Sequence, residues 1–415
     1  MSASGALESP RSPPRPLDDA LAALLGHAQA LAGTEAVSTF DADGRVLAQD
    51  LVSALQVPPH DNSSMDGYAV RSCEIAGEGV TLPISQRIPA GAAPDPLTPG
   101  SAARIFTGAP IPAGTDAVVM QEETESAGEQ IVRILRVPAP GQWIRRSGED
   151  VARGAVVLTR GQRLTPAALG LAASIGLDRL QVARRPRVAL FSTGDELVMP
   201  GEVKPEAMKA GAIYNSNRFF LRALLLRLDC EVTDMGIVPD RREATLEALH
   251  RASVEHDLIL TSGGVSVGEE DHIKPAVQQL GSLDLWQIAI KPGKPFAYGK
   301  VGTAHFIGLP GNPVSSFVTF LLLVRPFVLK LQGATELAPA SMSLPAHFAW
   351  PRADTRREFL RVRRNGRGGL DLFANQSSGV LTSAAWGDGL VDNPPGRSIA
   401  NGDPVSFISL AELLA

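Results

Sequence analysis

The sequence predicts a multidomain protein of the α/β plus β class, in which a doubly wound α/β domain is joined to a β-rich arm and a C-terminal β-barrel. Three observations lead to this prediction. The chain has 415 residues, more than the roughly 250 to 300 at which a single core stops growing. From residue 187 onward, apolar runs alternate with amphipathic stretches. The segments on either side of that region contain short β-like runs separated by Gly and Pro.

The N-terminal part of the chain predicts a tail followed by a helix. Residues 1–16 are rich in Ser and Pro and lack the apolar core of a signal peptide, so we expect a disordered tail. Apolar residues recur at helical spacing over 17–31. We assign 17–51 and 147–183 to a helical linking domain, with its N-terminal helix packing near the α/β domain.

Residues 52–146 predict the β-rich arm. Short apolar runs at 102–106, 117–120 and 130–135 are separated by Gly and Pro, as is typical of strands and turns. Polar residues concentrate at 61–68 (DNSSMDGY), 107–112 (TGAPIP) and 145–150 (RRSGED). The first two are each explained by ordinary turn chemistry when taken alone.

The α/β domain is expected over 184–332. Strands are expected at 188–191, 231–235, 258–260, 285–290 and 305–308, and helices at 216–228, 242–252, 273–280 and 314–331. This alternation implies a parallel sheet with helices on both faces. The apolar stretch 317–331 contains Arg325 and Pro326 and is too short to span the roughly 30 Å of a bilayer core, so we expect a buried helix.

Residues 333–415 return to strand-like runs, at 359–363, 370–373 and 405–408. We expect them to form a small C-terminal β-barrel, with a sandwich as the alternative.

Composition excludes several classes of function. The net charge of −5 argues against the basic surface that nucleic acid requires, and we expect neither nucleic acid nor a membrane as partner. Cys73 and Cys230 form no CxxC pair, so neither a disulfide framework nor a thiolate metal site is indicated. A reducing cytoplasmic location fits this cysteine usage.

Three glycine turns follow strands or precede helices of the α/β domain. Ligands of doubly wound sheets bind beyond the carboxyl ends of the strands, where backbone amides favour anions. The turn residues that we expect to bind the ligand are Ser192, Thr193, Gly194, Ser262, Gly263, Gly264, Ser266, Pro310, Gly311, Asn312 and Pro313. Any one turn could simply connect a strand to a helix. Three turns at the same edge favour an anion-binding pocket.

Acidic residues occur at the same strand ends. The candidates are Asp195, Glu196, Asp240 and Asp271. Like charges about 4 Å apart repel each other by roughly 4 kcal/mol at an effective dielectric constant of about 20. A pocket that also binds anions therefore needs a cation, and Mg²⁺ accepts one or two carboxylates together with phosphate oxygens. Alternatively, some of these acids complement helix dipoles.

Lys291 and Lys294 lie in the proline-rich stretch Lys-Pro-Gly-Lys-Pro. Lysine binds phosphate and similar oxyanions as a point charge, so we expect both ammonium groups near the glycine turns. A solvated surface pair is the alternative.

Other active-site patterns are poorly supported. The letters GxSxG occur at 264–268, but a nucleophile elbow needs a helix immediately after the serine, and here more loop and three acids follow. A Ser-His hydrolase is therefore disfavoured. Neither HExxH, a P-loop nor GxGxxG is present in the sequence.

Seven segments taken together carry a family resemblance. They are DNSSMDGYAVR (61–71), RIFTGAPIPAGTDAVVMQEE (104–123), IRRSGED (144–150), STGDEL (192–197), TSGGVSVGEED (261–271), IAIKPGKPFAYGK (288–300) and GLPGNPVSSF (308–317). In this order they resemble the molybdopterin molybdenumtransferase family, which includes bacterial molybdopterin biosynthesis proteins and the C-terminal domain of gephyrin. The resemblance covers nearly the whole chain after residue 16.

The resemblance implies a reaction and an assembly. Members use adenylylated molybdopterin, molybdate and Mg²⁺, and yield molybdenum cofactor and AMP. They form homodimers in which each site lies at the glycine turns and is completed by the partner subunit's arm. The molybdopterin adenylyltransferase and molybdoenzyme maturation proteins are candidate partners.

The resemblance also assigns residue roles. The residues expected to act in catalysis are Asp61, Thr107 and Asp150 of the arm, together with Asp271, Lys291 and Lys294, and the metal-site acids are Asp195, Glu196, Asp240 and Asp271. Arg356 and Ser378 of the last domain are expected to reach the site. Gln287 departs from the family, in which a basic residue is frequent at that position.

Two alternative functions remain open. The first is the molybdopterin adenylyltransferase step, whose enzymes share the α/β domain and a TSGG loop, although the additional arm and barrel argue against it. The second is a gephyrin-like scaffold with a vestigial site, although the intact acids and lysines argue against that role alone.

Overall fold

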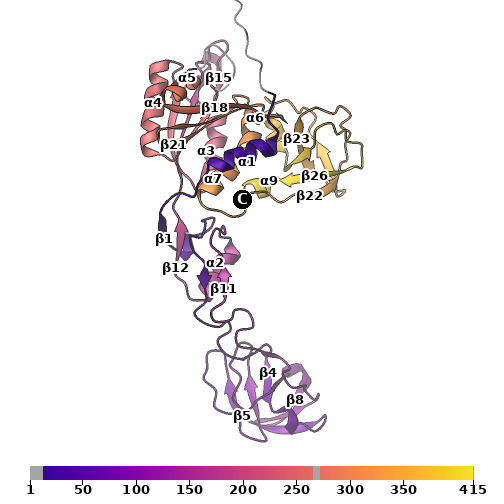
Figure 1. Ribbon diagram of the computed structural model, residues 1–415. Coiled ribbons are helices and arrows are strands. Elements are labelled where there is room, and N and C mark those ends of the chain that lie inside the picture. Colours follow the sequence, from indigo (N-terminus) through magenta and orange to yellow (C-terminus); the bar gives the residue numbers. More distant parts are fainter. Residues whose placement is uncertain (1–12, 265–271, 415) are drawn as a thin grey trace, which may run out of the picture.

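The computed structural model describes residues 13–264 and 272–414. The molecule is elongated, with the α/β and C-terminal domains side by side at one end, the arm at the other end, and the linking domain between them (Figure 1). The sequence-based predictions for residues 1–12 and for Ser266 and Asp271 lie outside the described residues.

A six-stranded sheet forms the centre of the α/β domain. Its strands are β13 (Arg187–Thr193), β16 (Glu231–Val238), β17 (Leu258–Ser262), β18 (Gly281–Gln287), β20 (Pro295–Val301) and β21 (Ala304–Leu309), in the order β16-β13-β17-β21-β20-β18. The first four in that order run parallel, as expected for a doubly wound domain. The strands β20 and β18 are antiparallel to their neighbours, so the prediction of a wholly parallel sheet was wrong.

A short connection explains the antiparallel pair. Only Gly302 and Thr303 separate β20 from β21, and a two-residue link can join strands only as a hairpin. Gly302 has a φ of +58°, a backbone conformation that glycine adopts without strain.

Helices cover both faces of this sheet, as predicted. They are α3 (Asn217–Arg227), α4 (Arg242–Glu255), α5 (Ile273–Leu280), and one continuous helical stretch made of α6 (Pro313–Thr319), a π-helical turn (Phe320–Val324) and α7 (Arg325–Leu331). Val188 and Leu190 share a buried cluster with α3 and α7, whereas Ala189 and Phe191 pack with α4 and α5. The alternation of side chains along β13 therefore sends neighbouring residues into two cores.

The stretch Pro313–Leu331 is long and apolar enough to cross a membrane. However, 83% of its apolar 18-residue segment is buried inside the protein. It is thus a core helix of this fold, in agreement with the prediction of a buried helix. Helix α1 (Leu17–His27) packs against it and contributes Leu24 to the same core. This helix is shorter than the predicted 17–31.

The linking domain is built from two small antiparallel pairs and one helix. β1 (Thr34–Ser38) pairs with β12 (Arg179–Ala183), and β2 (Leu51–Val52) pairs with β11 (Val156–Leu158). The side chain of Thr165 accepts a hydrogen bond from the Ala168 amide and so caps α2 (Pro166–Ser174).

Short 3-10 helices occur in the linking domain at 39–41, in the arm at 72–74 and 121–123, and in the α/β domain at 205–207.

The arm is β-rich, as predicted. Its strands are β3 (Asn62–Ser63), β4 (Gly67–Val70), β5 (Val80–Ile88), β6 (Ala102–Ile105), β7 (Ala117–Met120), β8 (Thr124–Gly128), β9 (Ile131–Ile134) and β10 (Ile144–Arg145). Six of them form one sheet in the order β7-β4-β6-β5-β9-β8. Two buried clusters, one containing Val119 and the other containing Val118, give the arm cores of its own.

The C-terminal domain contains β22 (Met342–Pro345), β23 (Arg357–Arg364), β24 (Leu370–Leu372), β25 (Gly389–Asn393) and β26 (Pro404–Ser409), with α8 (Leu381–Trp386) and α9 (Leu410–Leu414). The strand order is β19-β23-β25-β26-β22, with β24 on β23. One isolated bridge joins Ala346, directly after β22, to Leu370 of β24. A single bridge is not a continuous ladder between the two edge strands, so the predicted β-barrel is not confirmed. The strand β19 (Ile290–Lys291) belongs in sequence to the α/β domain but pairs with β23.

Candidate active site

The three predicted glycine turns meet at one cleft of about 720 Å³. The cleft lies at the carboxyl ends of β13, β17 and β21, which are neighbours in the sheet. The predicted turn residues that line it are Ser192, Thr193, Gly194, Ser262, Gly263, Gly264, Pro310, Gly311, Asn312 and Pro313. Ser266 lies outside the described residues.

Two of the turns approach each other so closely that a side chain would not fit. Gly263 has a φ of +95°, and a Cβ there would lie 2.9 Å from the Thr193 carbonyl oxygen. Its amide donates to the Leu309 carbonyl at 3.1 Å, which ties the second turn to the third. The glycine requirement therefore comes from the packing of the turns as well as from access to a ligand.

Asn217 joins the second and third glycine turns, and the sequence did not identify it as a site residue. Its side chain is 7% exposed, and its Nδ2 donates to Ser262 Oγ at 2.8 Å and to the Gly311 carbonyl at 2.7 Å. Its position at the start of α3, three residues after β15 (Ile213–Tyr214), was the available signal. A buried amide with two fixed acceptors holds the cleft floor rigid.

Two buried polar atoms at the cleft lack a hydrogen-bond partner within the described residues. They are Ser192 Oγ and Asn215 Nδ2. Buried polar groups in folded proteins are nearly always satisfied, so these atoms suit a polar ligand or water in the cleft.

The acids divide into two groups. Glu196 and Asp240 line the cleft, whereas Asp195 does not. Asp195 Oδ1 instead lies 3.4 Å from the amide of Asp240 and supports that residue's backbone. No group of three or more His, Cys, Asp or Glu side chains suited to a metal occurs within 13–264 and 272–414. Asp271, the fourth predicted acid, lies outside these ranges.

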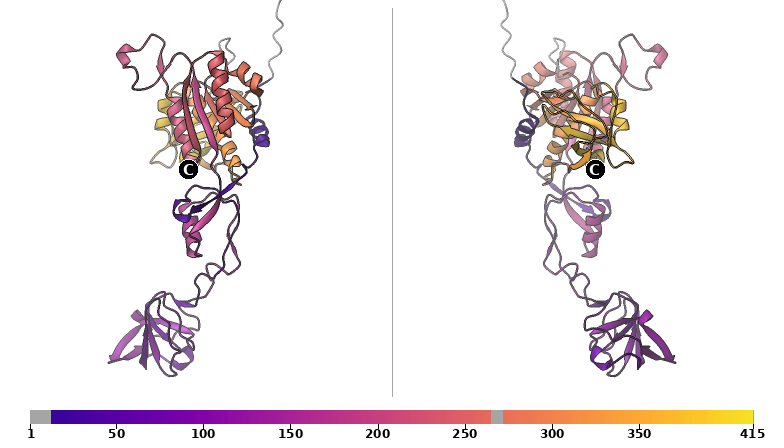
Figure 2. Two further views of the ribbon diagram at one scale, coloured as in Figure 1. Left: turned by 90° about the vertical axis from the view of Figure 1, so that its left-hand side faces the viewer. Right: turned by 90° about the vertical axis from the view of Figure 1, so that its right-hand side faces the viewer.

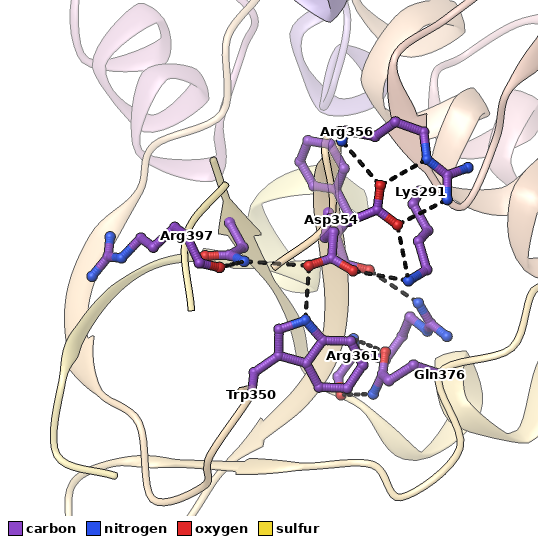
Figure 3. Close-up of polar contacts among 10 residues, drawn as sticks. Lys291, Trp350, Asp354, Arg356, Arg361, Gln376 and Arg397 are labelled. Carbon is purple, nitrogen blue, oxygen red and sulfur yellow. Dashed lines mark hydrogen bonds and ion pairs between the residues drawn. The ribbon is translucent and has the colours of Figure 1, made fainter. Parts of the chain in front are cut away.

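Neither of the two lysines is among the residues that line the cleft, and their contacts differ. Lys294 is exposed and adjoins Pro295, which lines the cleft. Lys291 does not line the cleft, and its Nζ lies 3.0 Å from Glu358 Oε1 and 3.3 Å from Asp354 Oδ2 (Figure 3).

The C-terminal domain reaches the cleft through one loop. The Val314 amide at the start of α6 donates to the Ser378 carbonyl at 2.9 Å, and the next residue, Gly379, lines the cleft. Arg356 does not line the cleft. Its guanidinium contacts both oxygens of Asp354, at 3.0 and 2.9 Å. These hydrogen bonds raise the pKa of Arg356.

Gln287 ends β18 and pairs in register with Pro295, which lines the cleft.

The arm residues lie at the end of the molecule opposite the α/β domain (Figures 1 and 2). Asp61 accepts from the Ser147 amide at 2.8 Å and pairs with Arg146 at 2.6 Å. The Ser147 hydrogen bond and the Arg146 charge lower the pKa of Asp61, although partial burial opposes the shift. None of the predicted arm residues lines the cleft of its own chain.

The other two arm candidates lie in neighbouring turns. The amide and Oγ1 of Thr107 both donate to Asp66 Oδ1, each at 2.8 Å, and these bonds lower the pKa of Asp66. Asp150 is exposed, and its amide donates to the Val57 carbonyl at 3.0 Å. The turns of the arm are thus fixed by hydrogen bonds within the arm.

An apolar groove of about 510 Å³ continues the cleft on one side. The groove and the cleft share Tyr214, Asn215 and Ser216. Phe219 and Phe220 of α3 form part of its lining, which contains no charged side chain. Phe219 is 53% exposed. A flat, uncharged ring would fit the groove beside a charged group in the cleft.

Three family models match successive parts of the chain. Residues 15–176 match the MoeA N-terminal region (domain I and II), 189–330 a probable molybdopterin binding domain, and 343–410 the MoeA C-terminal region (domain IV).

Individual proteins match over most of the chain. A molybdopterin molybdenumtransferase of Haemophilus influenzae is 43% identical over 88% of this chain and 91% of its own length. Gephyrin of Dictyostelium discoideum is 34% identical over 77% of this chain but only 50% of its own length. A solved molybdopterin biosynthesis moeA protein of Pyrococcus horikoshii OT3 has a TM-score of 0.83 at 30% identity, covering 96% of this chain and 100% of that one.

Proposed function

We propose that this chain, which belongs to the molybdopterin molybdenumtransferase family, transfers molybdenum from molybdate to adenylylated molybdopterin and releases AMP. The observation that carries the proposal is the meeting of three glycine turns with Glu196 and Asp240 in one cleft. Such turns suit the diphosphate of the substrate, because their backbone amides can approach it closely.

The cleft and groove together suit a substrate with a charged centre and flat rings. Ser192 Oγ and Asn215 Nδ2 are free to bond polar atoms of the substrate. The Phe219 side of the groove is suited to one ring, since aromatic stacking tolerates an uncharged heterocycle.

Magnesium fits the described residues in part. Glu196 and Asp240 offer hard carboxylate oxygens at one cleft, and Mg²⁺ typically takes one or two such ligands plus phosphate oxygens and water. When bound, the ion would neutralise charge on the diphosphate. Asp195 would hold the Asp240 backbone in place, and Lys294 would add a positive charge at the rim as AMP leaves.

We further propose a homodimer in which the partner's arm completes each cleft. The support is that Asp61, Thr107 and Asp150 do not line the cleft of their own chain. The arm also lies at the end of the molecule opposite the α/β domain (Figure 2). A two-fold dimer would let both arms serve the opposite subunits. A cytoplasmic enzyme would receive its substrate from the adenylyltransferase and pass its product to molybdoenzyme maturation proteins.

The two alternatives are less well supported. An adenylyltransferase does not need the arm and C-terminal regions, yet the match to the Haemophilus influenzae molybdenumtransferase extends over 88% of the chain. A scaffold with a vestigial site is favoured only by the gephyrin match, and the unsatisfied polar atoms of the cleft argue for a bound ligand.

The test is to mix the purified full chain with adenylylated molybdopterin and Mg²⁺ and to measure AMP with and without molybdate. We expect AMP release that depends on molybdate. A chain that makes adenylylated molybdopterin from molybdopterin and ATP, but releases no AMP with molybdate, would be an adenylyltransferase instead.

A further inference from the structure

Lys291 ties a segment of the cleft rim to the C-terminal domain. Residues 290 and 291 form β19, which pairs with β23 so that Lys291 lies opposite Glu358. The Lys291 Nζ is 3.0 Å from Glu358 Oε1 (Figure 3). The ion pair thus runs from the α/β segment of the chain to the sheet of another domain.

Glu358 is buried in a way that requires a cation. Its side chain is 1% exposed, and its Oε2 accepts from Trp350 Nε1 at 2.7 Å and from Asn393 Nδ2 at 3.4 Å. Within the described part of the chain, Lys291 is the cation that pairs with it. Lys291 is 40% exposed, so the pair is only half-buried, but removing the lysine leaves the buried Glu358 carboxylate without its cation, which is destabilising.

The charge of Lys291 is committed to this cluster. Asp354 and Glu358 supply two negative charges, and Lys291 and Arg356 supply two positive charges. Hydrogen bonds from Arg356 hold the pKa of Asp354 well below its usual range, although burial opposes the shift, so this acid stays ionised. Lys294, by contrast, is exposed and has no ion pair within the described residues.

The segment from Ile288 to Pro295 links the cluster to the cleft. The Ile288 amide donates to the Lys294 carbonyl at 2.7 Å, and the Arg357 amide donates to the Ala289 carbonyl at 3.0 Å. Pro295, at the end of the segment, lines the cleft. A shift of Lys291 would therefore move the rim.

We infer that Glu358 is a positioning residue: through Lys291 it holds the rim segment 288–295, and with it Pro295 at the cleft, against the C-terminal domain. This inference rests on the proposed function for its activity readout. It separates two lysines that their sequence motif treats alike.

The test uses Lys291→Met, Glu358→Gln, the double variant, Lys294→Met and, as a control, Lys300→Met, an exposed lysine of β20. Each full-length protein is measured for molybdate-dependent AMP release. Hydrogen exchange of the amides of 288–295 is followed by mass spectrometry. The exchange rate reports how firmly the rim segment is held, and it can be measured even in a variant that has no enzymatic activity.

We expect Lys291→Met to speed exchange of the rim amides roughly tenfold or more and to lower turnover, since Glu358 is left unpaired. Glu358→Gln should speed exchange and lower turnover as well, and the double variant should be no worse than the single variants, because each of them already lacks the ion pair that holds the rim. Lys294→Met should lower turnover without changing exchange, and Glu358→Gln should not rescue it.

If Lys291 binds the anion directly, Lys291→Met will be inactive while Glu358→Gln keeps wild-type turnover and the exchange of all variants stays at the wild-type rate, and the inference is overturned. Should Lys291→Met fail to fold, Glu358→Gln alone decides: faster exchange of the rim supports the inference, and unchanged exchange contradicts it. Wild-type protein without molybdate-dependent AMP release would refute the proposed function. The exchange results would still test whether the Lys291–Glu358 pair holds segment 288–295 in place.

Discussion

The predicted arm residues Asp61 and Thr107 have hydrogen-bond partners within the arm, whereas two buried polar atoms at the cleft have none in the described part of the chain. At the cleft, Ser192 Oγ and Asn215 Nδ2 are buried without a partner in the described structure. In the arm, Asp61 accepts from Ser147 and Arg146, and Asp66 accepts twice from Thr107. Three other buried atoms of the arm, Asn62 Oδ1, Thr115 Oγ1 and Trp143 Nε1, also lack a partner within the described residues. The difference therefore concerns the predicted site residues: those of the arm are already held in place, while the cleft keeps polar atoms that can bond a ligand or water.

The largest effect should come from the cleft acids. We expect Glu196→Gln combined with Asp240→Asn to lower molybdate-dependent AMP release roughly a hundredfold or more, because the two carboxylates proposed to hold a metal at the diphosphate are then absent. The melting temperature should change little, since both residues line an open cleft. Glu202→Gln, an exposed acid of the loop after β14 (Leu197–Val198), is the control. Equal losses in the control would show that general surface charge, rather than the cleft, is responsible.

Acid stability should distinguish the α/β domain from the arm. Burial alone would raise the pKa of Asp257, but hydrogen bonds from Arg184 and from the Arg187 amide lower it to about 2. A lowered folded-state pKa gives stability that is present above the ordinary pKa of about 4 and is lost as pH falls toward 2. At neutral pH this contribution is roughly 2 kcal/mol.

Calorimetric unfolding between pH 7 and pH 2.5 checks this prediction. Asp257→Asn should unfold at lower temperature at neutral pH and should lose less stability on acidification than the wild type. Asp61→Asn is the matched variant in the arm, where the carboxylate is 37% exposed and solvent weakens the pair. If Asp61→Asn shows the larger acid effect, the assignment of the pH dependence to Asp257 is wrong.

A smaller effect should appear at the groove. We expect Phe219→Ala to weaken AMP binding by roughly five- to tenfold, the loss typical of one stacked ring. Binding of ribose 5-phosphate, which lacks the base, should not change. Leu226→Ala truncates another exposed side chain of the same helix outside the groove and serves as the control. Equal AMP affinities for both variants and the wild type would place the base elsewhere.

Sequence patterns predicted what depends on local chemistry. The glycine turns and the strands that end in them were recognised because strand, turn and helix follow one another directly in the chain. The antiparallel β20 was missed because a run such as Pro-Phe-Ala-Tyr-Gly carries no sign of strand direction, and only its pairing with β21 fixes it. The closure of a barrel likewise depends on long-range pairing that periodicity does not encode.

Long-range partners also account for the site residues that sequence reasoning missed or misplaced. Asn217 became recognisable only once Ser262 and Gly311 were brought beside it. Lys291 and Lys294 look equivalent in their motif, but 67 residues separate Lys291 from the buried Glu358 that binds it. A motif identifies residue types, and the tertiary fold decides which of them face the substrate.

The most direct test of the proposed pairing of cleft and arm is complementation in mixed dimers. One variant carries Asp61→Asn in the arm, and the other carries Glu196→Gln with Asp240→Asn in the cleft. The two inactive proteins are unfolded, mixed in equal amounts and refolded together. If each cleft uses its partner's arm, mixed dimers contain one intact site and the mixture should recover roughly a quarter of wild-type AMP release by random assortment. A mixture that stays as inactive as its two components, although the mixed dimers form, would contradict this account.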